Sequence, residues 1–252
     1  MTTITSIATY LHELLNVQNI SDYCPNGLQV AGRERIKKIV TGVTACQDLL
    51  DAAVVEKADA IVVHHGFFWK GENPCLIGTK YNRLQTLLKN DISLFAYHLP
   101  LDLHIEYGNN IQLGKLLNMK NITQATAKNN LDLIFLGELA HQQSAHDFSN
   151  FINLKLNRMP LHIAKTNKLI KTIAWCTGAA ANYIEDAIQL GVDAYLTGEI
   201  SEHTVHTARE AGIHLFAAGH HATERYGVRA LGEHLSQKFN LQHQFIDIDN
   251  PI

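Results

Sequence analysis

Short runs of β-branched and aliphatic residues alternate with helical patterns along almost the whole chain of 252 residues. Strands that are separated by helices of about ten residues form crossover units, which place the strands side by side in a mainly parallel or mixed sheet. The predicted strands are residues 38–43, 60–63, 92–97, 171–176, 194–197, 213–218 and 244–248. The predicted helices after the N-terminal segment are residues 47–56, 82–89, 183–190, 203–211 and 223–238. The alternation therefore predicts an α/β fold.

The N-terminal segment and the cysteines indicate a soluble, reduced protein. Residues 1–16 have no basic stretch and no cleavage signal, and Ile4, Ile7 and Leu11 instead recur at the spacing of an amphipathic helix with a Thr cap. No apolar run approaches the roughly 20 residues that span a bilayer. The four cysteines lie far apart without a CxxC pair, so neither a zinc ribbon nor a dense disulfide framework is predicted. We expect a cytoplasmic location and no membrane partner.

A weak internal repeat relates the two halves of the chain. Residues 38–66 and 171–199 each contain a strand that ends in a Gly/Thr turn, an Ala-rich helix, and an Asp-Ala pair that starts the next strand. Chance similarity between ordinary α/β units would explain this pattern, and so would two related lobes facing one another. We adopt two related α/β lobes with mixed sheets flanked by helices, residues 1–125 and 126–252, with a cleft between their strand ends. Residues 120–165 look less regular and are expected to serve structural packing.

The composition argues against a nucleic-acid partner, and it shows an excess of histidine that needs an explanation. Lys and Arg total 21 and Asp and Glu total 24, so the formal net charge is −3. We therefore expect no basic face of the kind that nucleic-acid-binding proteins use. The 15 histidines are the excess, and histidine is a common metal ligand that titrates near neutral pH.

Two histidine motifs follow predicted strands in the first half. His64-His65-Gly66 comes directly after residues 60–63, and both imidazoles serve one site only if the chain turns there, which Gly66 permits. Residues 98–102 (HLPLD) follow the strand at 92–97, and Pro100 predicts a loop rather than a regular helix through this pentad. Packing or surface histidines, and an Asp102 that caps the next helix, are the alternative interpretations.

A third motif lies in the second half, at residues 219–224 (GHHATE), between a predicted strand and a helix. His220 and Glu224 are four residues apart and share nearly one helix face if the helix begins near His221. The separation of four matches that between His98 and Asp102. Glu224 could instead be a carboxylate in the first turn that the helix dipole favours.

Together the three motifs predict a metal site. Parallel α/β sheets bind ligands outside the carboxyl ends of their strands, so we expect the motifs to share the cleft. Imidazole with carboxylate is the donor set of Zn²⁺, Fe²⁺, Mn²⁺ or Ni²⁺, and thiolates are missing from it. Five or six donors exceed what one ion with an open position needs, whereas they suit two ions that share a bridging carboxylate.

The motifs and their order resemble one known family, the GTP cyclohydrolase 1 type 2 homologues, also called the NGG-interacting-factor-like family. The matching segments are SDYCPNGLQV (21–30), KIVTGVTA (38–45), ADAIVVHHGFFWKG (58–71), YHLPLDLHIEYGNN (97–110), DAYLTGEISEHTVHTAREAG (193–212) and AAGHHATER (217–225). They span nearly the whole chain, and residues 120–165 carry no recognised motif.

The resemblance implies which residues bind metal. Two divalent ions per chain would be held by His64, His65, Asp102, His220 and Glu224, with Glu224 as the bridge. His98 matches a position beside the site and is expected to be a neighbour rather than a ligand. Glu199, His203 and His206 match a segment near the metals in the second lobe, and His221 is adjacent to a ligand without being required as one.

The resemblance also implies an assembly and an activity. The assembly is a toroidal homohexamer whose metal sites face the interior. The activity is a metal-dependent hydrolysis by metal-bound hydroxide, in which His98 or His203 would transfer protons. The family label names GTP cyclohydrolase, yet the chain has no GxxxxGK[ST] loop and no GxGxxG after a strand. Phosphates would therefore need the metals or scattered cations such as Lys70, Arg225 and Arg229.

Other functions use the same residues. A non-enzymatic metal-binding scaffold or metal-handling protein needs the same donors, and a protein-interaction module with a structural metal is a third interpretation. Nothing in the sequence selects a substrate.

Overall fold

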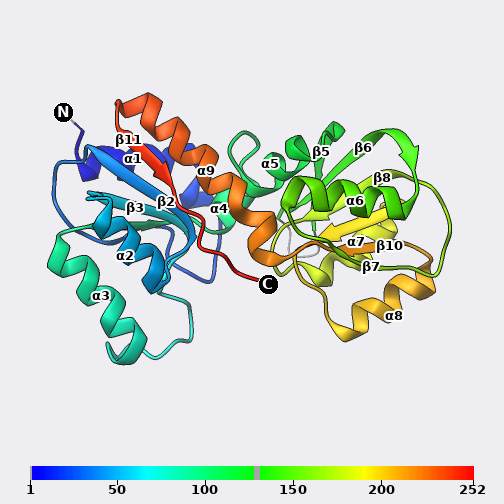
Figure 1. Ribbon diagram of the computed structural model, residues 1–252, viewed down its shortest axis with the longest axis horizontal. Coiled ribbons are helices and arrows are strands. Elements are labelled where there is room, and N and C mark those ends of the chain that lie inside the picture. Colours follow the sequence, from blue (N-terminus) through cyan, green and yellow to red (C-terminus); the bar gives the residue numbers. More distant parts are fainter. Residues whose placement is uncertain (1, 128–130) are drawn as a thin grey trace. The chain divides into compact units, whose positions relative to one another are not determined.

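The computed structural model describes residues 2–127 and 131–252, and the chain divides into two compact units. Unit 1 comprises Met1–Gly108 and Gly227–Asp249, and unit 2 comprises Asn109–Tyr226 and Asn250–Ile252. The chain thus changes unit after Gly108, Tyr226 and Asp249, whereas the predicted lobes divide once, between residues 125 and 126. Each unit holds a mixed sheet flanked by helices, as predicted for an α/β fold (Figure 1).

Unit 1 contains a five-stranded sheet in the order β1-β4-β3-β2-β11. Strand β1 is antiparallel to β4, and the remaining neighbours are parallel. The strands are β1 (Gly27–Val30), β2 (Lys38–Thr44), β3 (Ala60–His65), β4 (Ser93–Ala96) and β11 (Gln242–Phe245). The helices are α1 (Ile4–Leu14), η1 (Val17–Asn19), α2 (Gln47–Val55), α3 (Gly78–Asn90), α4 (Leu99–Leu103) and, from Gly227 on, α9 (His220–Phe239).

Both faces of the unit 1 sheet are buried, because successive residues of a strand point to opposite sides. Ala60 and Val62 pack in the apolar cluster that α1 and the later part of α9 complete. Ile61 and Val63 pack in a second cluster with residues of α2 and α3. Burial on both faces explains why the central strands β3 and β4 carry continuous apolar runs rather than alternating sequences. By the same alternation, His64 faces the side of α1 and α9.

Helix α1 begins as the sequence predicts. Thr3 is the N-cap, and its Oγ1 accepts a hydrogen bond from the N–H of Ser6 at 3.1 Å. The Thr3 N–H in turn donates to Ser6 Oγ at 3.0 Å, which completes a capping box. Ile4, Ile7 and Leu11 lie on the buried face of the helix.

Unit 2 contains a six-stranded sheet in the order β5-β6-β8-β9-β10-β7. The pairs β8–β9 and β9–β10 are parallel, and the outer pairs are antiparallel. The strands are β5 (Lys120–Ala125), β6 (Ile134–Gln143), β7 (Leu161–Ile163), β8 (Ile170–Cys176), β9 (Ala194–Thr197) and β10 (His214–Ala217). The helices are α5 (Asn109–Leu116), α6 (Ala145–Leu156), η2 (Ala181–Tyr183), α7 (Ile184–Gln189), α8 (Glu202–Ala211) and the first turns of α9.

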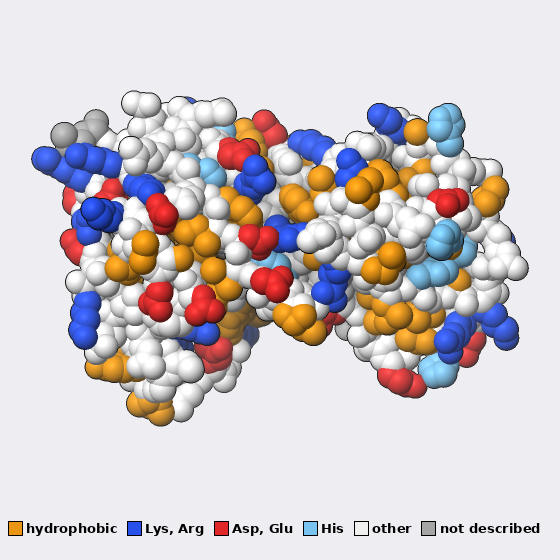
Figure 2. Space-filling view, viewed as in Figure 1, with side chains coloured by type: hydrophobic (Ala, Val, Ile, Leu, Met, Phe, Trp, Pro, Cys, Tyr) orange, Lys and Arg blue, Asp and Glu red, His pale blue; other side chains and the backbone are white. Residues whose placement is uncertain are grey.

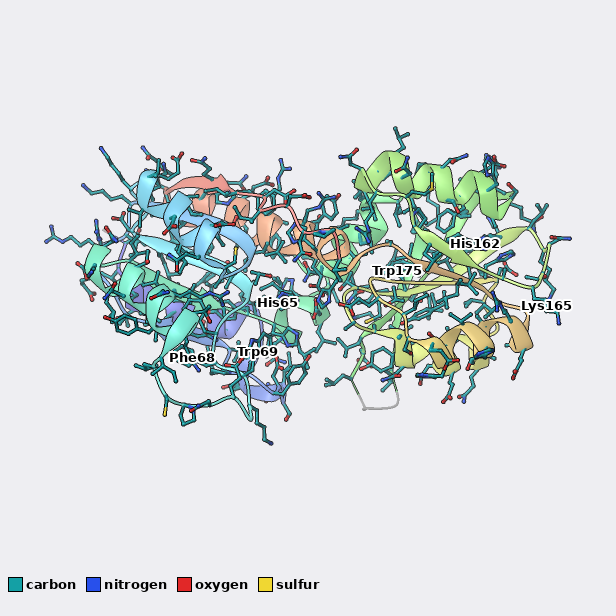
Figure 3. The ribbon with its side chains drawn as sticks, turned by 60° about the horizontal axis from the view of Figure 1, so that its bottom comes forward. His65, Phe68, Trp69, His162, Lys165 and Trp175 are labelled. Atoms are coloured by element: carbon teal, nitrogen blue, oxygen red, sulfur yellow. The ribbon has the colours of Figure 1, made fainter. Side chains whose placement is uncertain are left out.

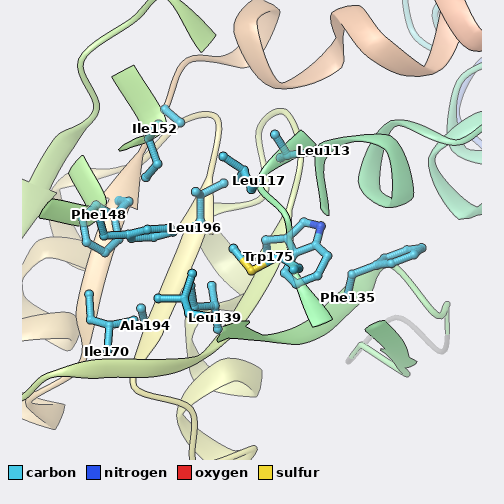
Figure 4. Close-up of a cluster of buried hydrophobic side chains, with 14 of the residues drawn as sticks. Leu113, Leu117, Phe135, Leu139, Phe148, Ile152, Ile170, Trp175, Ala194 and Leu196 are labelled. Carbon is cyan, nitrogen blue, oxygen red and sulfur yellow. The ribbon is translucent and has the colours of Figure 1, made fainter. Parts of the chain in front are cut away.

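Trp175 of β8 lies in the apolar core of unit 2 (Figure 4). Its indole N–H donates to the carbonyl of Asn110 at 2.9 Å, so the ring is buried with its polar atom satisfied. Phe148 of α6 meets Phe216 of β10 edge to face, with ring centroids 5.1 Å apart. Helices α5 and α6 therefore cover this sheet through aromatic and aliphatic contacts.

The prediction of a less regular segment at residues 120–165 is wrong. The described residues of this segment form β5, β6, α6 and β7, and Phe135 and Leu139 of β6 belong to the core. Strand β6 loses its apolar alternation in its second half, where residues 140–142 are exposed. Because it pairs antiparallel with β8, it also lacks the strand–helix–strand rhythm that revealed the other strands.

The two units share a four-stranded arrangement, which supports the interpretation of the repeat as two related lobes. Strands β1-β4-β3-β2 of unit 1 correspond in order and direction to β7-β10-β9-β8 of unit 2. Asp59 Oδ2 accepts the backbone N–H groups of residues 37 and 38, at 2.7 and 2.9 Å. Asp193 Oδ2 accepts those of residues 171 and 172, at 3.0 and 2.9 Å. The repeated Asp therefore holds the start of the neighbouring strand in both units.

When the two units are aligned strand by strand, the His98–Asp102 pair and the His220–Glu224 pair do not coincide but are offset by one residue. The pairings of β3 with β4 and of β9 with β10 align His98 with Gly219. His220, the first residue of α9, then aligns with Leu99, the first residue of α4. In the same register His65 aligns with Glu199. The equal spacing of the pairs is therefore not a strict structural correspondence.

Charged side chains of both signs are interspersed on the face shown in Figure 2. Several histidine side chains also lie on the surface of unit 2 in that view. None of the helices formed by the described residues is long and apolar enough to cross a membrane.

Candidate metal centre

Strand β3 ends in two adjacent histidines whose rings lie close together. His64 is completely buried, and its Nδ1 is 2.9 Å from the carbonyl oxygen of Tyr97. His65 is partly exposed, and its Nδ1 is 3.1 Å from Thr44 Oγ1. The two ring centroids are 4.4 Å apart although both residues belong to the strand. The predicted turn at Gly66 is therefore not what brings the two imidazoles together.

The segment after β4 is helical, which corrects the prediction of a loop. Helix α4 spans Leu99–Leu103, with His98 as its N-cap and Pro100 in its first turn. Proline is tolerated there because the first N–H groups of a helix have no partner within the helix. The helix buries Asp102 and places Asp102 Oδ1 3.6 Å from His64 Nε2.

His98 adds a third imidazole to unit 1. Its ring centroid is 5.0 Å from that of His64 and 5.7 Å from that of His65. One potential ligand atom from each of the three histidines lies within 4.8 Å of the others. Unit 1 therefore gathers three imidazoles, with the Asp102 carboxylate beside His64.

Two aromatic side chains flank His98. The rings of Tyr23 and Trp69 both meet its imidazole edge-on, with centroid distances of 5.0 and 5.2 Å. Figure 3 shows His65, Phe68 and Trp69 at one end of unit 1. The N–H of Lys70 donates to the Tyr23 carbonyl at 2.8 Å, which ties the loop after β3 to the segment before β1.

Unit 2 contains a histidine between two carboxylates. His220 Nδ1 is 2.5 Å from Glu199 Oε1, and its Nε2 is 3.0 Å from Glu224 Oε2. Burial disfavours the imidazolium, but hydrogen bonds and charge from Glu224 and Glu199 outweigh burial and raise the pKa of His220 to about 9. Without a metal ion, the imidazolium form is therefore favoured near pH 7.

A glycine makes room for this group. Gly178, after β8, has φ +69°, and a Cβ added there would lie 2.1 Å from Glu224 Oε1 and 3.2 Å from His220 Nε2. The N–H of Gly178 donates to Thr223 Oγ1 at 3.1 Å. The close approach of backbone to the Glu224 carboxylate therefore requires the absence of a side chain.

The other predicted histidines of unit 2 have contacts of their own. His203 and His206 are exposed on α8, with His203 Nδ1 3.0 Å from Ser201 Oγ and His206 Nε2 2.9 Å from Glu202 Oε1. His221 is buried, and its backbone N–H donates to the Ile252 carbonyl at 2.9 Å. The proton-transfer roles of His98 and His203 remain predictions.

The cations considered for phosphate binding have other contacts. The Arg225 guanidinium donates to the Leu156 carbonyl at 2.5 Å, and Arg229 pairs with Glu233 at 3.0 Å. Lys70 is exposed in the loop after β3.

Asp22 and Asn26 are site residues to which the sequence reasoning assigned no role. The Asp22 carboxylate accepts a hydrogen bond from His98 Nδ1 at 3.0 Å, and Asn26 Oδ1 accepts the His98 N–H at 2.7 Å. Both residues fall in the matched segment SDYCPNGLQV, but about 70 residues separate them from His98 along the chain. Only the tertiary structure reveals that they contact His98, since no spacing rule links such distant positions.

The donor chemistry fits divalent metal ions. His64 and His98 each have an oxygen acceptor at Nδ1, which places a proton on Nδ1 and the lone pair of the neutral ring on Nε2. His220 has a carboxylate at each ring nitrogen, Glu199 at Nδ1 and Glu224 at Nε2. Metal-bound histidines are held in this way by carboxylates or backbone carbonyls. Asp102 in unit 1 and Glu224 in unit 2 add carboxylate oxygens, so each unit offers nitrogen and oxygen donors of the kind that transition metals bind.

Sequence comparison gives a match across almost the whole chain. The family profile of Duf34/NIF3 (NGG1p interacting factor 3) matches residues 2–251. A GTP cyclohydrolase 1 type 2 homolog of Pseudomonas aeruginosa is 56% identical over 237 residues, which cover 94% of each chain. A protein of the same name from Escherichia coli strain K12 is 50% identical over 248 residues, or 98% of each chain.

Solved structures extend the likeness to the fold. A structural-genomics structure of the protein ybgI, of unknown function, has a TM-score of 0.95 and 49% identity, with all of both chains covered. A protein of Thermus thermophilus has a TM-score of 0.89 and 28% identity, again over both whole chains. The likeness therefore extends over both units. The chain belongs to the Duf34/NIF3 (NGG1p interacting factor 3) family.

Proposed function

We propose that this protein binds two divalent metal ions per chain and is a metal-dependent hydrolase of the GTP cyclohydrolase 1 type 2 homologue kind. The ligands in this proposal are His64, His65, Asp102, His220 and Glu224, with Glu224 bridging the ions. The ions would be Zn²⁺, Fe²⁺, Mn²⁺ or Ni²⁺, because imidazole and carboxylate donors suit all four. The names of the relatives support the choice of reaction, and the donor groups support the choice of metal.

One observation carries the proposal: ligand histidines in both units have oxygen acceptors at Nδ1. The Tyr97 carbonyl faces His64, and the Glu199 carboxylate faces His220. Such contacts hold the ring orientation and raise the basicity of the nitrogen that binds the metal. An imidazole that served packing alone would not need this orientation.

Two bound metal ions would supply Lewis acidity and a water activated near neutral pH, which suits hydrolysis. The residues of the chain would orient the substrate and exclude water around it. Tyr23 and Trp69 present aromatic surface beside the imidazoles of unit 1, and burial of Asp102 and Glu224 strengthens their electrostatic interactions. His98 would transfer protons in this proposal, because its ring packs against those of His64 and His65.

Metal analysis tests the metal part of the proposal. Protein purified without chelator should contain about two divalent ions per chain, whereas no bound metal, even after metal is added, would overturn the proposal. If Glu224 bridges, Glu224→Ala should remove more metal than His98→Ala. Equal and small losses in the two variants would contradict the bridging role.

A hydrolase screen tests the reaction. The substrates are GTP, other nucleotides, phosphoesters and cyclic amides, and His64→Ala serves as the blank. Turnover in the wild type that is lost in the blank is the expected result. Equal activity in both, with metal bound to the wild type, would instead identify a non-enzymatic metal-binding scaffold or metal-handling protein.

We also propose that the chains assemble into a toroidal homohexamer in the cytoplasm, as the resemblance to the family implies. Light scattering coupled to size-exclusion chromatography should give a mass six times the 28.1 kDa of one chain. A monomeric or dimeric mass at micromolar concentration would contradict the assembly. The cysteines of the described residues are all free thiols, which fits a reducing compartment.

A further inference from the structure

A buried carboxylate stands behind His98. The side chain of Asp22 is 2% exposed and that of His98 is 8% exposed, so their contact is shielded from water. Asp22 Oδ1 lies 3.0 Å and Oδ2 3.2 Å from His98 Nδ1. A buried carboxylate of this kind needs several hydrogen-bond donors to remain charged.

Three further donors hold the Asp22 carboxylate in place. Oδ2 accepts the backbone N–H of Leu99 at 3.0 Å and the side-chain N–H of Asn26 at 2.9 Å. Oδ1 accepts the backbone N–H of Tyr23 at 2.7 Å. Burial opposes ionisation, but the hydrogen bonds from His98, Asn26 and Leu99 outweigh it and lower the pKa of Asp22 to about 2. The group is therefore a carboxylate that only accepts hydrogen bonds.

The carboxylate determines which nitrogen of His98 carries the proton. A neutral imidazole has one N–H and one lone pair, and an acceptor at Nδ1 requires the N–H there. The lone pair is then on Nε2, the nitrogen that lies 3.4 Å from the hydroxyl of Tyr23. The His98 ring also packs against His64 and His65, the two ligands of unit 1 at the end of β3.

The backbone of His98 is held by the same segment. Asn26 donates to Asp22 through Nδ2 and accepts the His98 N–H through Oδ1 at 2.7 Å. Asp22 and Asn26 thus contact both ends of the residue, the ring and the main chain. This double attachment orients the imidazole more firmly than a single hydrogen bond would.

We propose that Asp22 is a positioning residue that, with Asn26, holds His98 in the tautomer with its lone pair on Nε2. In this tautomer His98 acts beside the proposed metal site as an acceptor of a proton or hydrogen bond, and not as a donor. The role rests on the proposed function, whereas the tautomer itself is a property of the metal-free chain.

Asp22→Asn tests the proposal because it should reverse the tautomer. The amide oxygen of the substituted side chain would take the place of Oδ2, because there it keeps the donors Leu99 and Asn26, whereas at Oδ1 it would keep Tyr23 and lose both. The amide NH₂ would then face His98 Nδ1 and donate to it, which moves the ring proton to Nε2. The same exchange in a Ser-His-Asp triad leaves the geometry intact but stabilises the wrong tautomer.

The measurement is long-range ¹H–¹⁵N correlation NMR on histidine-labelled, metal-free protein at about pH 8.5, where an ordinary imidazole is neutral. His98→Gln assigns the signals by loss of one ring. Asp59→Asn is the matched control, because Asp59 is also a buried carboxylate of unit 1 that accepts backbone N–H groups. Its substitution should leave the His98 signals unchanged.

The expected result is an Nδ1–H signal for His98 in the wild type and in Asp59→Asn, with an Nε2–H signal in Asp22→Asn. A wild-type ring that is protonated on Nε2, or that averages between both forms, would overturn the proposal even if Asp22→Asn does not fold. An unchanged tautomer in a folded Asp22→Asn would overturn it as well.

The outcome is distinguishable from failure of the proposed function. Absence of bound metal with the expected tautomer would refute the metal site and leave the positioning role of Asp22 intact. Bound metal in a chain whose His98 carries its proton on Nε2 would support the metal site and refute the positioning role of Asp22.

Discussion

At the scale of single residues, the groups at both ring nitrogens distinguish two of the proposed ligand histidines. His64 and His220 each have an oxygen acceptor at Nδ1, and Nε2 of each ring faces a carboxylate that is itself a proposed ligand, Asp102 or Glu224. His243 instead uses Nε2 to reach Thr41 Oγ1 at 2.8 Å, and His162 uses Nε2 to reach Nδ1 of His214 at 3.1 Å. The sequence shows that the chain has 15 histidines but not which nitrogen of each is engaged.

Because the backbone of Gly178 lies so close to the Glu224 carboxylate, we expect Gly178→Ala to weaken metal binding. The new Cβ would collide with the Glu224 carboxylate, so we expect metal affinity to fall about tenfold or more in a metal-competition titration. Gly191→Ala is the matched control, because Gly191 also has φ +69° but open space around its Cα. Equal losses in the two variants would attribute the effect to backbone strain rather than to the site.

Two partly buried histidines, His162 and His243, predict a loss of stability in mild acid. Burial lowers the pKa of His243 and, together with the charge of His214, lowers the pKa of His162. The unfolded chain therefore binds protons first, and the free energy of unfolding should decrease as pH falls below about 6.5. Urea unfolding between pH 8 and 5 measures this slope.

The slope should become shallower in His243→Gln and His162→Gln. The same replacement at the exposed His12 of α1 controls for the removal of an imidazole as such. A slope that His12→Gln flattens as much as His243→Gln or His162→Gln does would contradict the assignment.

At the scale of elements, the strands were more predictable than the segments that follow them. The predicted bounds of β9 agree with the structure, because its residues are all buried in one apolar run. Helix α4 was predicted as a loop, because Pro100 excludes a helix interior but not a first turn. The side chains His98 and Asp102 belong to this short element, so the error concerned the site directly.

Asp193, the residue before β9 in unit 2, leads to a prediction at the scale of elements. Asp193 accepts the N–H groups of residues 171 and 172 and the hydroxyl of Thr172. Asp193→Ala leaves these donors without an acceptor and should lower the free energy of unfolding by about 1–2 kcal/mol. Glu185→Ala, at an exposed position in the first turn of α7, should change it by less than about 0.5 kcal/mol. Chemical denaturation measures the free energy of unfolding of both variants, and equal decreases would refute the role of Asp193.

At the scale of the whole molecule, the chain crosses between its two units more than once. Helix α9 contributes His220 and Glu224 to unit 2 and then packs Val228 and Leu231 in the core of unit 1. The proposed ligands therefore come from both units, so metal binding should be linked to the folding of both.

Metal should accordingly stabilise the complete chain. A metal ion at 100 times its Kd adds about 2.7 kcal/mol to the free energy of unfolding, which is visible as a higher Tm in calorimetry. Glu224→Ala should lose most of this gain. Glu233→Ala, which removes an exposed carboxylate of the same helix, should keep it. A gain in Tm that Glu224→Ala retains in full would refute the ligand role.

The α/β class, the α1 cap and the strands with parallel neighbours in both units follow from the sequence alone, whereas β1, β5, β6 and β7 do not. They depend on local properties: the burial of short apolar runs, the capping preference of Thr3, and the rhythm of strand and helix. The histidines at the end of β3 and after β10 were also identifiable, because position at a strand end is a local pattern.

Tertiary structure decided which distant groups act on those histidines. Asp22 reaches His98, Glu199 reaches His220, and Gly178 admits the Glu224 carboxylate. Each contact joins residues about 20 to 80 positions apart, and a hydrogen bond forms only where folding brings the two groups within about 3 Å. The sequence determined the residue types available for metal binding, and the folded chain determined the orientation, charge and tautomer of each.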